Sequence, residues 1–578
     1  MWAKAREVLR THFGYPDFRP GQADAIRSIL TGRDSLVVMP TGGGKSICYQ
    51  VPALLLPGLT LVVSPLIALM LDQVSSLEAR RIPAALINST LTPDEIHARL
   101  ARALAGDIKL LYVAPERFES AAFRRALERM DVSMVAVDEA HCVCEWGHDF
   151  RPSYLKLREV WPLIGAPPVL ALTATATPEA RHDIVAELRL RSARVIVRGF
   201  DRPNLHWIVR REEKLSKKTR MLVRLLGATD EVAIVYAATR KLVESAAELL
   251  RGAGIHAAAY HAGLSQDVRA RVQEAWTTGE VPVVVATNAF GMGVDKPDVR
   301  RVIHFQMPGS LEAYYQEAGR AGRDGEPAEC ILLHSYRDRF THEFFIRASH
   351  PPRKVVLATY RALREASERD GRPVPAARFA HRVPGIKSTR EVYSALRILS
   401  VAGAVENAAA DSRCAIRWIV SPGELEALAA DGDVTAELEP SWLMLRGLSR
   451  ASRYGRRRSL RLSLRELARF AGGDFASARL ALDALQAAGV LGWRADTTRS
   501  GYRPTDPGAA AESLSIDWRR VATRRSVELR KLKRMEGYAY QRGCRRRYLL
   551  RYFGEDSVAW RCGSCDRCAP RSGVGVAP

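Results

Sequence analysis

The sequence predicts an α/β protein in which two lobes, each built on a mostly parallel β-sheet, precede a smaller and largely helical part. Residues 33–345 alternate short apolar segments with amphipathic helical segments, the pattern of a parallel sheet covered by helices on both faces. GFDRPN at 199–204 interrupts this pattern, which restarts near Glu231, so we expect two sheets. The alternation ends after residue 345, which predicts the helical part.

The apolar segments give the positions of the expected strands. In the first lobe they are 35–39, 60–63, 109–113, 134–137 and 169–172. In the second lobe they are 232–236, 257–260, 283–286 and 301–305.

Composition limits the class of protein. The 578 residues are enough for several domains of about 100–200 residues each. No apolar run is long enough to span a membrane, and MWAKAREVLRTHFG has no apolar signal core, so we expect a cytosolic protein without a membrane partner. The net charge is +23, and residues 441–578 hold 29 Lys and Arg against 12 Asp and Glu. This concentration of charge indicates a polyanionic partner such as nucleic acid, with a generally arginine-rich proteome as the alternative.

Two segments of the helical part resemble each other at an offset of 86 residues. SALRILSVAGAVE (394–406) and LALDALQAAGVLG (480–492) each indicate a helix that ends at glycine, an apolar strand, polar turns and a second strand. This is the outline of a winged helix-turn-helix that occurs twice. Two ordinary helical hairpins are the alternative.

The segment MPTGGGKS (39–46) lies between an expected strand and an expected helix. Its glycines let backbone N–H groups approach phosphate oxygens, and the helix N-terminus favours negative charge. Lys45 would reach the β- and γ-phosphates, and Ser46 would ligate Mg²⁺. Met39 stands where the strict motif has glycine, so this segment alone does not establish a nucleotide loop.

Asp138 and Glu139 follow an apolar strand, at the edge where open α/β sheets bind ligands. Asp138 can hold Mg²⁺ through water, and Glu139 can orient and deprotonate an attacking water. In the second lobe, QEAGRAGRDG (316–325) places Arg320 and Arg323 on one face if the segment is helical. An arginine that reaches a γ-phosphate stabilises charge in the transition state, although this segment alone fits solvated arginines as well.

Four of the nine cysteines cluster near the end of the sequence, at Cys544, Cys562, Cys565 and Cys568. Four thiolates at this spacing suit a structural tetrahedral Zn²⁺. A ferredoxin-type iron–sulfur run is the alternative, but its close fourth cysteine is missing.

Together these motifs carry a resemblance. TGGGKS, SPLIALMLDQV (64–74), APER (114–117), DEAH (138–141), LTATAT (172–177), VVATNAFGMGVDKP (284–297) and QEAGRAGRDG occur in the order of superfamily 2 helicases. FGYPDFRPGQ (13–22), CEWGHDFRP (144–152) and CRRRYLLRYFGE (544–555) narrow this to a chain that resembles the RecQ family of DNA helicases, over residues 1–345 and 526–570.

The resemblance implies two RecA-like motor lobes followed by a helical zinc-binding platform and winged-helix domains. It implies an ATP-dependent 3′→5′ DNA helicase of DNA repair, recombination and replication, cytoplasmic and nucleoid-associated, with ATP, Mg²⁺ and structural Zn²⁺. Its partners would be single-stranded and duplex DNA, and no protein partner is indicated. A duplex translocase or RNA helicase with the same motor is an alternative, and so is a DNA-binding scaffold with an idle ATPase.

The resemblance also assigns residues. Tyr15, Arg19 and Gln22 would recognise adenine, and the loop Thr41, Gly42, Gly43, Gly44, Lys45 and Ser46 would bind the phosphates. Arg320 and Arg323 would complete the catalytic site with Lys45, Asp138 and Glu139. The segment after the acids would be a loop that contacts single-stranded DNA and reports its presence to the ATP site, through His141, Trp146, His148, Phe150 and Arg151. Stacking on an aromatic contributes about 1–3 kcal/mol per base; simple filling of a crevice is the alternative.

We divide the chain accordingly. The parts are lobe 1 (1–199), lobe 2 (200–345), a first platform part (346–372), two winged helices (373–430 and 431–510), a helical zinc-binding part (511–570) and a tail (571–578). In the resembling family the zinc cluster usually follows the second lobe closely, whereas here both winged-helix candidates come before it. We expect helices at 352–366 and 527–541 to pack together as one platform that zinc staples, with apolar stripes at Val356, Tyr360 and Leu363 and at Leu529, Leu532 and Met535.

Overall fold

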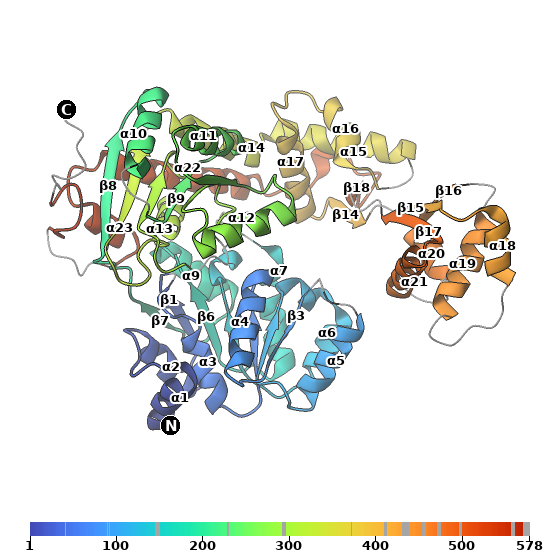
Figure 1. Cartoon of the computed structure of the whole chain (residues 1–578), viewed down its shortest axis with the longest axis horizontal. Helices are drawn as coiled ribbons and strands as arrows, with labels where there is room; N and C mark the ends of the chain where they lie inside the picture. The colour runs from blue at the N-terminus through green and yellow to red at the C-terminus, as the bar shows by residue number, and fades with distance from the viewer. Residues whose placement is uncertain are drawn as a thin grey trace. The chain divides into compact units, whose positions relative to one another are not determined.

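The computed structural model describes residues 1–569 apart from 41, 89–90, 92, 145–150, 228–230, 292–295, 371–372, 410–412, 431–438, 454–457, 471–474, 496–499 and 556–560. The chain forms two compact units, which we describe separately (Figure 1). Unit 1 comprises Met1–Phe344 and Ser526–Pro578, and unit 2 comprises Phe345–Arg525. Unit 2 is therefore inserted into unit 1 along the sequence.

Lobe 1 of unit 1 is built on a seven-stranded parallel sheet with the order β3-β4-β2-β5-β6-β1-β7. The strands are β1 (Ser35–Val38), β2 (Leu59–Val63), β3 (Ala84–Ile87), β4 (Leu110–Val113), β5 (Val132–Val137), β6 (Val169–Thr173) and β7 (Arg194–Val197). All five expected strands form. The apolar pattern misses β3, which opens with two alanines, and β7, which is half exposed at the sheet edge.

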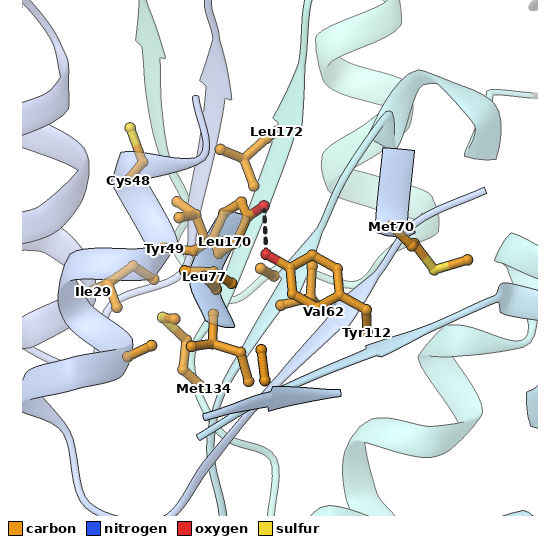
Figure 2. Packing of buried hydrophobic residues seen from close by; sticks show 14 of the residues in the cluster. Ile29, Cys48, Tyr49, Val62, Met70, Leu77, Tyr112, Met134, Leu170 and Leu172 are labelled. Carbon is orange, nitrogen blue, oxygen red and sulfur yellow. Dashed lines mark hydrogen bonds between the residues drawn. The ribbon is translucent and has the colours of Figure 1, made fainter. Parts of the chain in front are cut away.

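The helices of lobe 1 include α1 (Trp2–Phe13), α2 (Gln22–Leu30), α3 (Ile47–Leu55), α4 (Ile67–Ala79), α5 (Pro93–Leu104) and α9 (Pro178–Glu187). Figure 2 shows the core beside α3, where Tyr49 of this helix and Tyr112 of β4 point toward each other. Both rings are buried, and their hydroxyl oxygens lie 3.3 Å apart. Because buried hydroxyls need hydrogen-bond partners, this pair ties α3, and with it the preceding MPTGGGKS segment, to the sheet.

Lobe 2 is built on a six-stranded parallel sheet with the order β10-β11-β9-β12-β13-β8. The strands are β8 (Leu205–Arg211), β9 (Ala233–Tyr236), β10 (Ala257–Tyr260), β11 (Val283–Ala286), β12 (Arg301–His304) and β13 (Ala328–His334). The helices include α10 (Leu215–Gly227), α11 (Arg240–Gly252), α12 (Gln266–Thr278) and α13 (Leu311–Ala318). The two lobes and their parallel sheets are confirmed. β8 lies at the edge of the sheet and begins directly after the GFDRPN segment.

Unit 2 contains the two repeats, but their strands do not pair as two consecutive winged helices would. β14 (Val405–Ala409) follows α17 (Thr389–Val401) and pairs with β18 (Ser500–Pro504), with Ala409 opposite Ser500. β15 (Arg413–Trp418) pairs instead with β16 (Ser459–Ser463) and β17 (Leu491–Ala495). The division at 430/431 is therefore wrong for the sheets: an inner module (413–495) sits between the paired strands of an outer module (353–409 and 500–504). Local apolar patterns locate strands, but they do not identify a partner about 90 residues away.

The remaining elements of unit 2 follow this nesting. The outer module also has α15 (Arg353–Asp370) and α16 (Ala376–Phe379), and the inner module has α18 (Pro422–Ala430), α19 (Glu439–Ala451), α20 (Leu464–Phe470) and α21 (Phe475–Ala487). Each module has its own buried cluster, the outer around Tyr360 and Leu396 and the inner around Met444 and Leu482.

The two helices of the expected platform divide between the units: α15 lies in unit 2, whereas residues 526–540 of α22 (Trp518–Tyr540) lie in unit 1. The stripe Val356, Tyr360 and Leu363 of α15 is buried in the outer module of unit 2. Leu532 and Met535 belong to α22 in the part that lies in unit 1, so the two stripes serve different cores. An apolar stripe predicts that one face of a helix is buried, but it does not identify the element against which that face packs.

α22 has 23 residues, yet no helix within the described ranges is both long and apolar enough to cross a membrane.

Candidate functional site

The glycine loop lies between β1 and α3, at the carboxyl edge of the lobe 1 sheet. Gly42 and Gly44 have φ angles of 80° and 77°, a region that favours glycine. A Cβ on Gly43 would lie 2.9 Å from the Pro40 carbonyl oxygen, so a side chain would clash there. Ser46 is the N-cap of α3, which directs the first N–H groups of that helix toward the loop. Thr41 lies outside the described residues.

The side chains of Lys45 and of two residues predicted to bind adenine donate hydrogen bonds to the backbone of this loop. The Lys45 Nζ donates to the carbonyl oxygens of Met39 (3.2 Å) and Pro40 (3.4 Å). The Gln22 Nε2 donates to the Gly44 carbonyl oxygen at 3.0 Å, and an Nη of Arg19 donates to that of Gly42 at 2.6 Å. Tyr15 is 48 % exposed. The structure therefore brings Arg19 and Gln22 to the loop backbone, whereas their recognition of adenine stays a prediction.

Asp138 and Glu139 follow β5, two strands from β1 in the same sheet. Burial, together with the adjacent Glu139, raises the pKa of Asp138 to about 7, whereas Lys45 opposes the shift. Lys45 is thus near enough to act on Asp138 electrostatically. A cation beside Asp138 would favour its charged form, which suits this carboxylate to hold a nucleotide-bound metal.

Glu139 adopts a left-handed conformation with φ 47° and ψ 44°, which is uncommon for a residue other than glycine. Its carboxylate lies 3.2 Å from the His141 Nδ1, which also lies 2.9 Å from the Thr173 hydroxyl at the end of β6. His141 thus connects the second acid to the LTATAT segment. Strained backbone conformations cluster at functional sites, and this one lies directly after β5, at the carboxyl edge of the sheet.

The predicted aromatic loop is described at 141–144 and from Arg151 onward, but not between. Trp146, His148 and Phe150 lie outside the described residues. Arg151 follows them; its backbone N–H donates to the Cys142 carbonyl oxygen, and its guanidinium lies 3.7 Å from the Glu116 carboxylate. DNA contact by these residues stays a prediction.

Arg320 and Arg323 follow α13 in a turn, because the helix ends at Ala318, and the conditional expectation of one helical face is not met. Arg320 is buried within lobe 2, where its guanidinium donates to the Gly291 carbonyl oxygen. Arg323 extends to lobe 1: a Cβ on Gly42 would lie 3.7 Å from its Cγ. Lobe 2 therefore presents Arg323 to the phosphate loop, whereas the hydrogen bond of Arg320 to Gly291 lies within lobe 2.

The four predicted zinc ligands converge. The Sγ atoms of Cys544, Cys562, Cys565 and Cys568 all lie within 4.8 Å of one another. Cys544 is the N-cap of α23 (Arg545–Tyr552), and Cys565 forms a parallel bridge with Trp207 of β8. A set of four thiol donors fits tetrahedral Zn²⁺.

Sequence reasoning missed two residues that support this cluster. Asp566, between two of the cysteines, accepts a hydrogen bond from the Arg545 Nε at 3.0 Å and another from the Val209 N–H of β8 at 3.0 Å. Arg545 is 1 % exposed. An acid within a cysteine cluster, next to an arginine-rich helix, is a signal that could have indicated this buried pair.

Three family models match the chain: DEAD/DEAH box helicase at 19–184, helicase conserved C-terminal domain at 217–325 and RecQ zinc-binding at 512–569. The "ATP-dependent DNA helicase RecQ" of Bacillus subtilis is 46% identical over 356 residues, 61% of this chain and 60% of that protein. The "Probable ATP-dependent DNA helicase RecS" of the same organism is 41% identical over 371 residues, 64% of this chain and 74% of that protein.

Among solved structures, Mycobacterium smegmatis helicase Lhr bound to single-stranded DNA and AMP-PNP is 23% identical, with a TM-score of 0.47 over 69% of this chain and 57% of that one. The chain spans 54–60% of the length of three bacterial proteins called RecQ, including the one from Bacillus subtilis.

Proposed function

We propose a function for the chain from one premise, which is that it belongs to the RecQ family of superfamily 2 helicases. The proposed function is ATP-driven unwinding of duplex DNA by translocation on single-stranded DNA with 3′→5′ polarity, in DNA repair, recombination and replication. The observation that carries it is the approach of Arg323 from lobe 2 to Gly42 in the phosphate loop of lobe 1. A motor needs ATP hydrolysis to depend on the relative position of two lobes, and this contact supplies such a dependence.

The site supports hydrolysis with a division of roles. The loop N–H groups and Lys45 would hold the phosphates, and Ser46 and Asp138 would hold Mg²⁺, which would neutralise charge on the phosphates. Glu139 would orient the attacking water and accept its proton, held in place by His141. Arg323 would stabilise the charge that develops on the γ-phosphate. Arg320, buried in lobe 2, would support the turn that carries Arg323.

Two features support DNA as the partner. The net charge of +23 favours a polyanion. On α17 of unit 2, Arg390, Tyr393 and Arg397 form an exposed stripe, which suits phosphate contacts to a duplex. The inner module has Asp483 at the position equivalent to Arg397, and this carboxylate accepts from the Trp493 indole N–H at 3.0 Å. We therefore assign duplex contact to the outer module.

A strand-displacement assay tests the function. Substrates would carry a 3′ or a 5′ single-stranded tail on DNA or on RNA, with ATP and Mg²⁺. We expect separation of 3′-tailed DNA only. Separation of RNA alone would favour an RNA helicase, and nucleic-acid-stimulated ATPase without separation of any substrate would favour a duplex translocase.

A further inference from the structure

The GFDRPN segment that joins the two lobes does more than connect them. Arg202 and Asn204 lie between β7 of lobe 1 and β8 of lobe 2, and their side chains point to the turn that carries Arg320 and Arg323. The sequence motifs assign neither residue a role in binding or catalysis. Both residues are partly buried, and so are their hydrogen bonds to Gly322.

Arg202 holds the backbone of that turn at several carbonyls. One Nη atom donates to the carbonyl oxygens of Gly322 at 2.6 Å and Ala321 at 3.0 Å, and the other donates to that of Gly319 at 3.4 Å. The turn leaves these carbonyls without helical partners, because α13 ends at Ala318. The Arg202 guanidinium thus supplies these carbonyl oxygens with the donors that a further helical turn would have provided.

Asn204 holds the same turn from its other end. Its Nδ2 donates to the carbonyl oxygens of Gly322 at 2.8 Å and Glu326 at 2.9 Å, on either side of Arg323. Its Oδ1 lies 3.4 Å from the Arg202 Nε. Gly322 has φ 54°, and a Cβ there would lie 2.5 Å from the Asn204 Nδ2. Glycine at 322 and asparagine at 204 therefore fit each other closely, next to the backbone of Arg323.

The first half of the segment is anchored to the zinc-bearing end of unit 1. Phe200 stacks on Phe553 with ring centroids 4.6 Å apart, and its N–H donates to the Glu555 carboxylate at 3.1 Å. Arg546 of α23 forms an ion pair with Asp201. The segment is thus fixed at one end by the C-terminal part, while its other end holds the arginine turn.

We propose that Arg202 and Asn204 are positioning residues for Arg323, which they place against the phosphate loop; this inference rests on the proposed function. Their side-chain hydrogen bonds go to the turn, and they act by fixing the backbone on both sides of Arg323. A displacement of about 1 Å of a catalytic group can cost about 100-fold in rate. Loss of either side chain should therefore slow hydrolysis without weakening nucleotide binding to lobe 1.

The test uses the full chain with Arg202→Ala, Arg202→Lys and Asn204→Ala. The kcat and KM of DNA-stimulated ATPase and the Kd of a fluorescent ATP analogue would be measured. We expect kcat to fall about 10- to 100-fold in both alanine variants, with KM and Kd within about twofold, and partial recovery in Arg202→Lys. Arg251→Ala is the matched control, because it removes a guanidinium bond to a carbonyl within α11 and β10 of lobe 2, and it should retain kcat.

A double-mutant cycle with Arg323→Ala separates positioning from a merely structural role. If Asn204 acts through Arg323, Asn204→Ala should cause no further loss of kcat in the Arg323→Ala background. The same fold-loss in both backgrounds, an unchanged kcat in the single variants, or a loss that follows a lower thermal midpoint would each overturn the proposal. A parent protein without ATPase would instead refute the proposed function. An active parent that depends on Arg323 but not on Arg202 or Asn204 would refute only the positioning role.

Discussion

Unit 1 and unit 2 differ in where their polar side chains lie. In unit 1, Lys45 contacts Met39 directly after β1, and His141 links Glu139 to Thr173 at the end of β6. Arg323 of the second lobe approaches Gly42 in the phosphate loop. In unit 2, by contrast, Arg390, Tyr393 and Arg397 of α17 are exposed in a single stripe, and no residue predicted for ATP or zinc is present. Under the proposed function, this difference predicts that ATP hydrolysis depends on unit 1, so substitutions there should alter the chemistry, whereas substitutions in unit 2 should alter nucleic-acid binding.

The largest expected effect is on Lys45. Lys45→Ala should reduce ATPase and unwinding by about 10³-fold or more, because a cation at the phosphates stabilises both binding and the transition state. Duplex binding, measured by fluorescence anisotropy, should stay near that of the parent. Full ATPase activity in this variant would refute the assignment of residues 39–46 as the phosphate-binding loop.

Glu139→Gln tests the base within the same unit. The amide keeps the shape of the side chain but cannot accept a proton, so hydrolysis should fall by about 10²-fold or more while ATP still binds. Binding and single-turnover hydrolysis of labelled ATP would be measured side by side. Asp131→Asn is a suitable control, since this acid precedes β5 at the opposite end of the strand; a similar loss there would show that the effect is not local.

Removal of zinc tests whether the C-terminal part of unit 1 is separately stabilised. Zinc binding in small sites is worth about 10–16 kcal/mol of folding free energy, so chelation or Cys565→Ser should unfold the segment around α23. Hydrogen exchange should rise at 544–555 and at Trp207 and Val209 of β8, which hydrogen-bond to residues 564–566, while β1 and β5 stay protected. Uniform loss of protection across both lobes would contradict this division.

The aromatic loop should give a smaller effect. Trp146→Ala or Phe150→Ala should leave basal ATPase near the parent value but weaken its stimulation by single-stranded DNA by about fivefold or more, which corresponds to about 1 kcal/mol of lost stacking. Titration of ATPase with oligonucleotides measures this. If both variants respond to DNA like the parent, the loop merely fills space.

The smallest effect on ATPase is expected from excision of the inner module. Because Ala409 and Ser500 face each other, residues 410–499 can be replaced by Asn-Gly, which closes a two-residue hairpin between β14 and β18. ATPase should stay within about twofold of the parent. Removal of 431–510 instead takes away β18 and should lower the thermal midpoint of unit 2. Equal behaviour of the two variants would contradict the nested topology.

The sequence predicts features that depend on residues close together in the chain better than features that depend on distant residues. Lys45, Asp138 and Glu139 each follow an apolar strand, and parallel strands bring such positions to one edge, so these residues were predictable. The pairing of β14 with β18 was not, because no local pattern identifies a distant partner. The roles of Arg320 and Arg323 could not be separated, because α13 ends at Ala318 and the turn sends them in different directions. Arg202 was read only as part of a linker, since hydrogen bonds to carbonyls leave no mark in the sequence.

The central claim is that lobe 1 binds the nucleotide while lobe 2 contributes Arg323 to hydrolysis. The most direct measurement is a comparison of ATP affinity and single-turnover hydrolysis in the parent and in Arg323→Ala, with single-stranded DNA present. The account predicts a Kd for ATP within about threefold of the parent and a hydrolysis rate lower by about 10³-fold, since a catalytic arginine acts mainly on the transition state. A rate equal to that of the parent, or a loss explained entirely by weaker ATP binding, would contradict it.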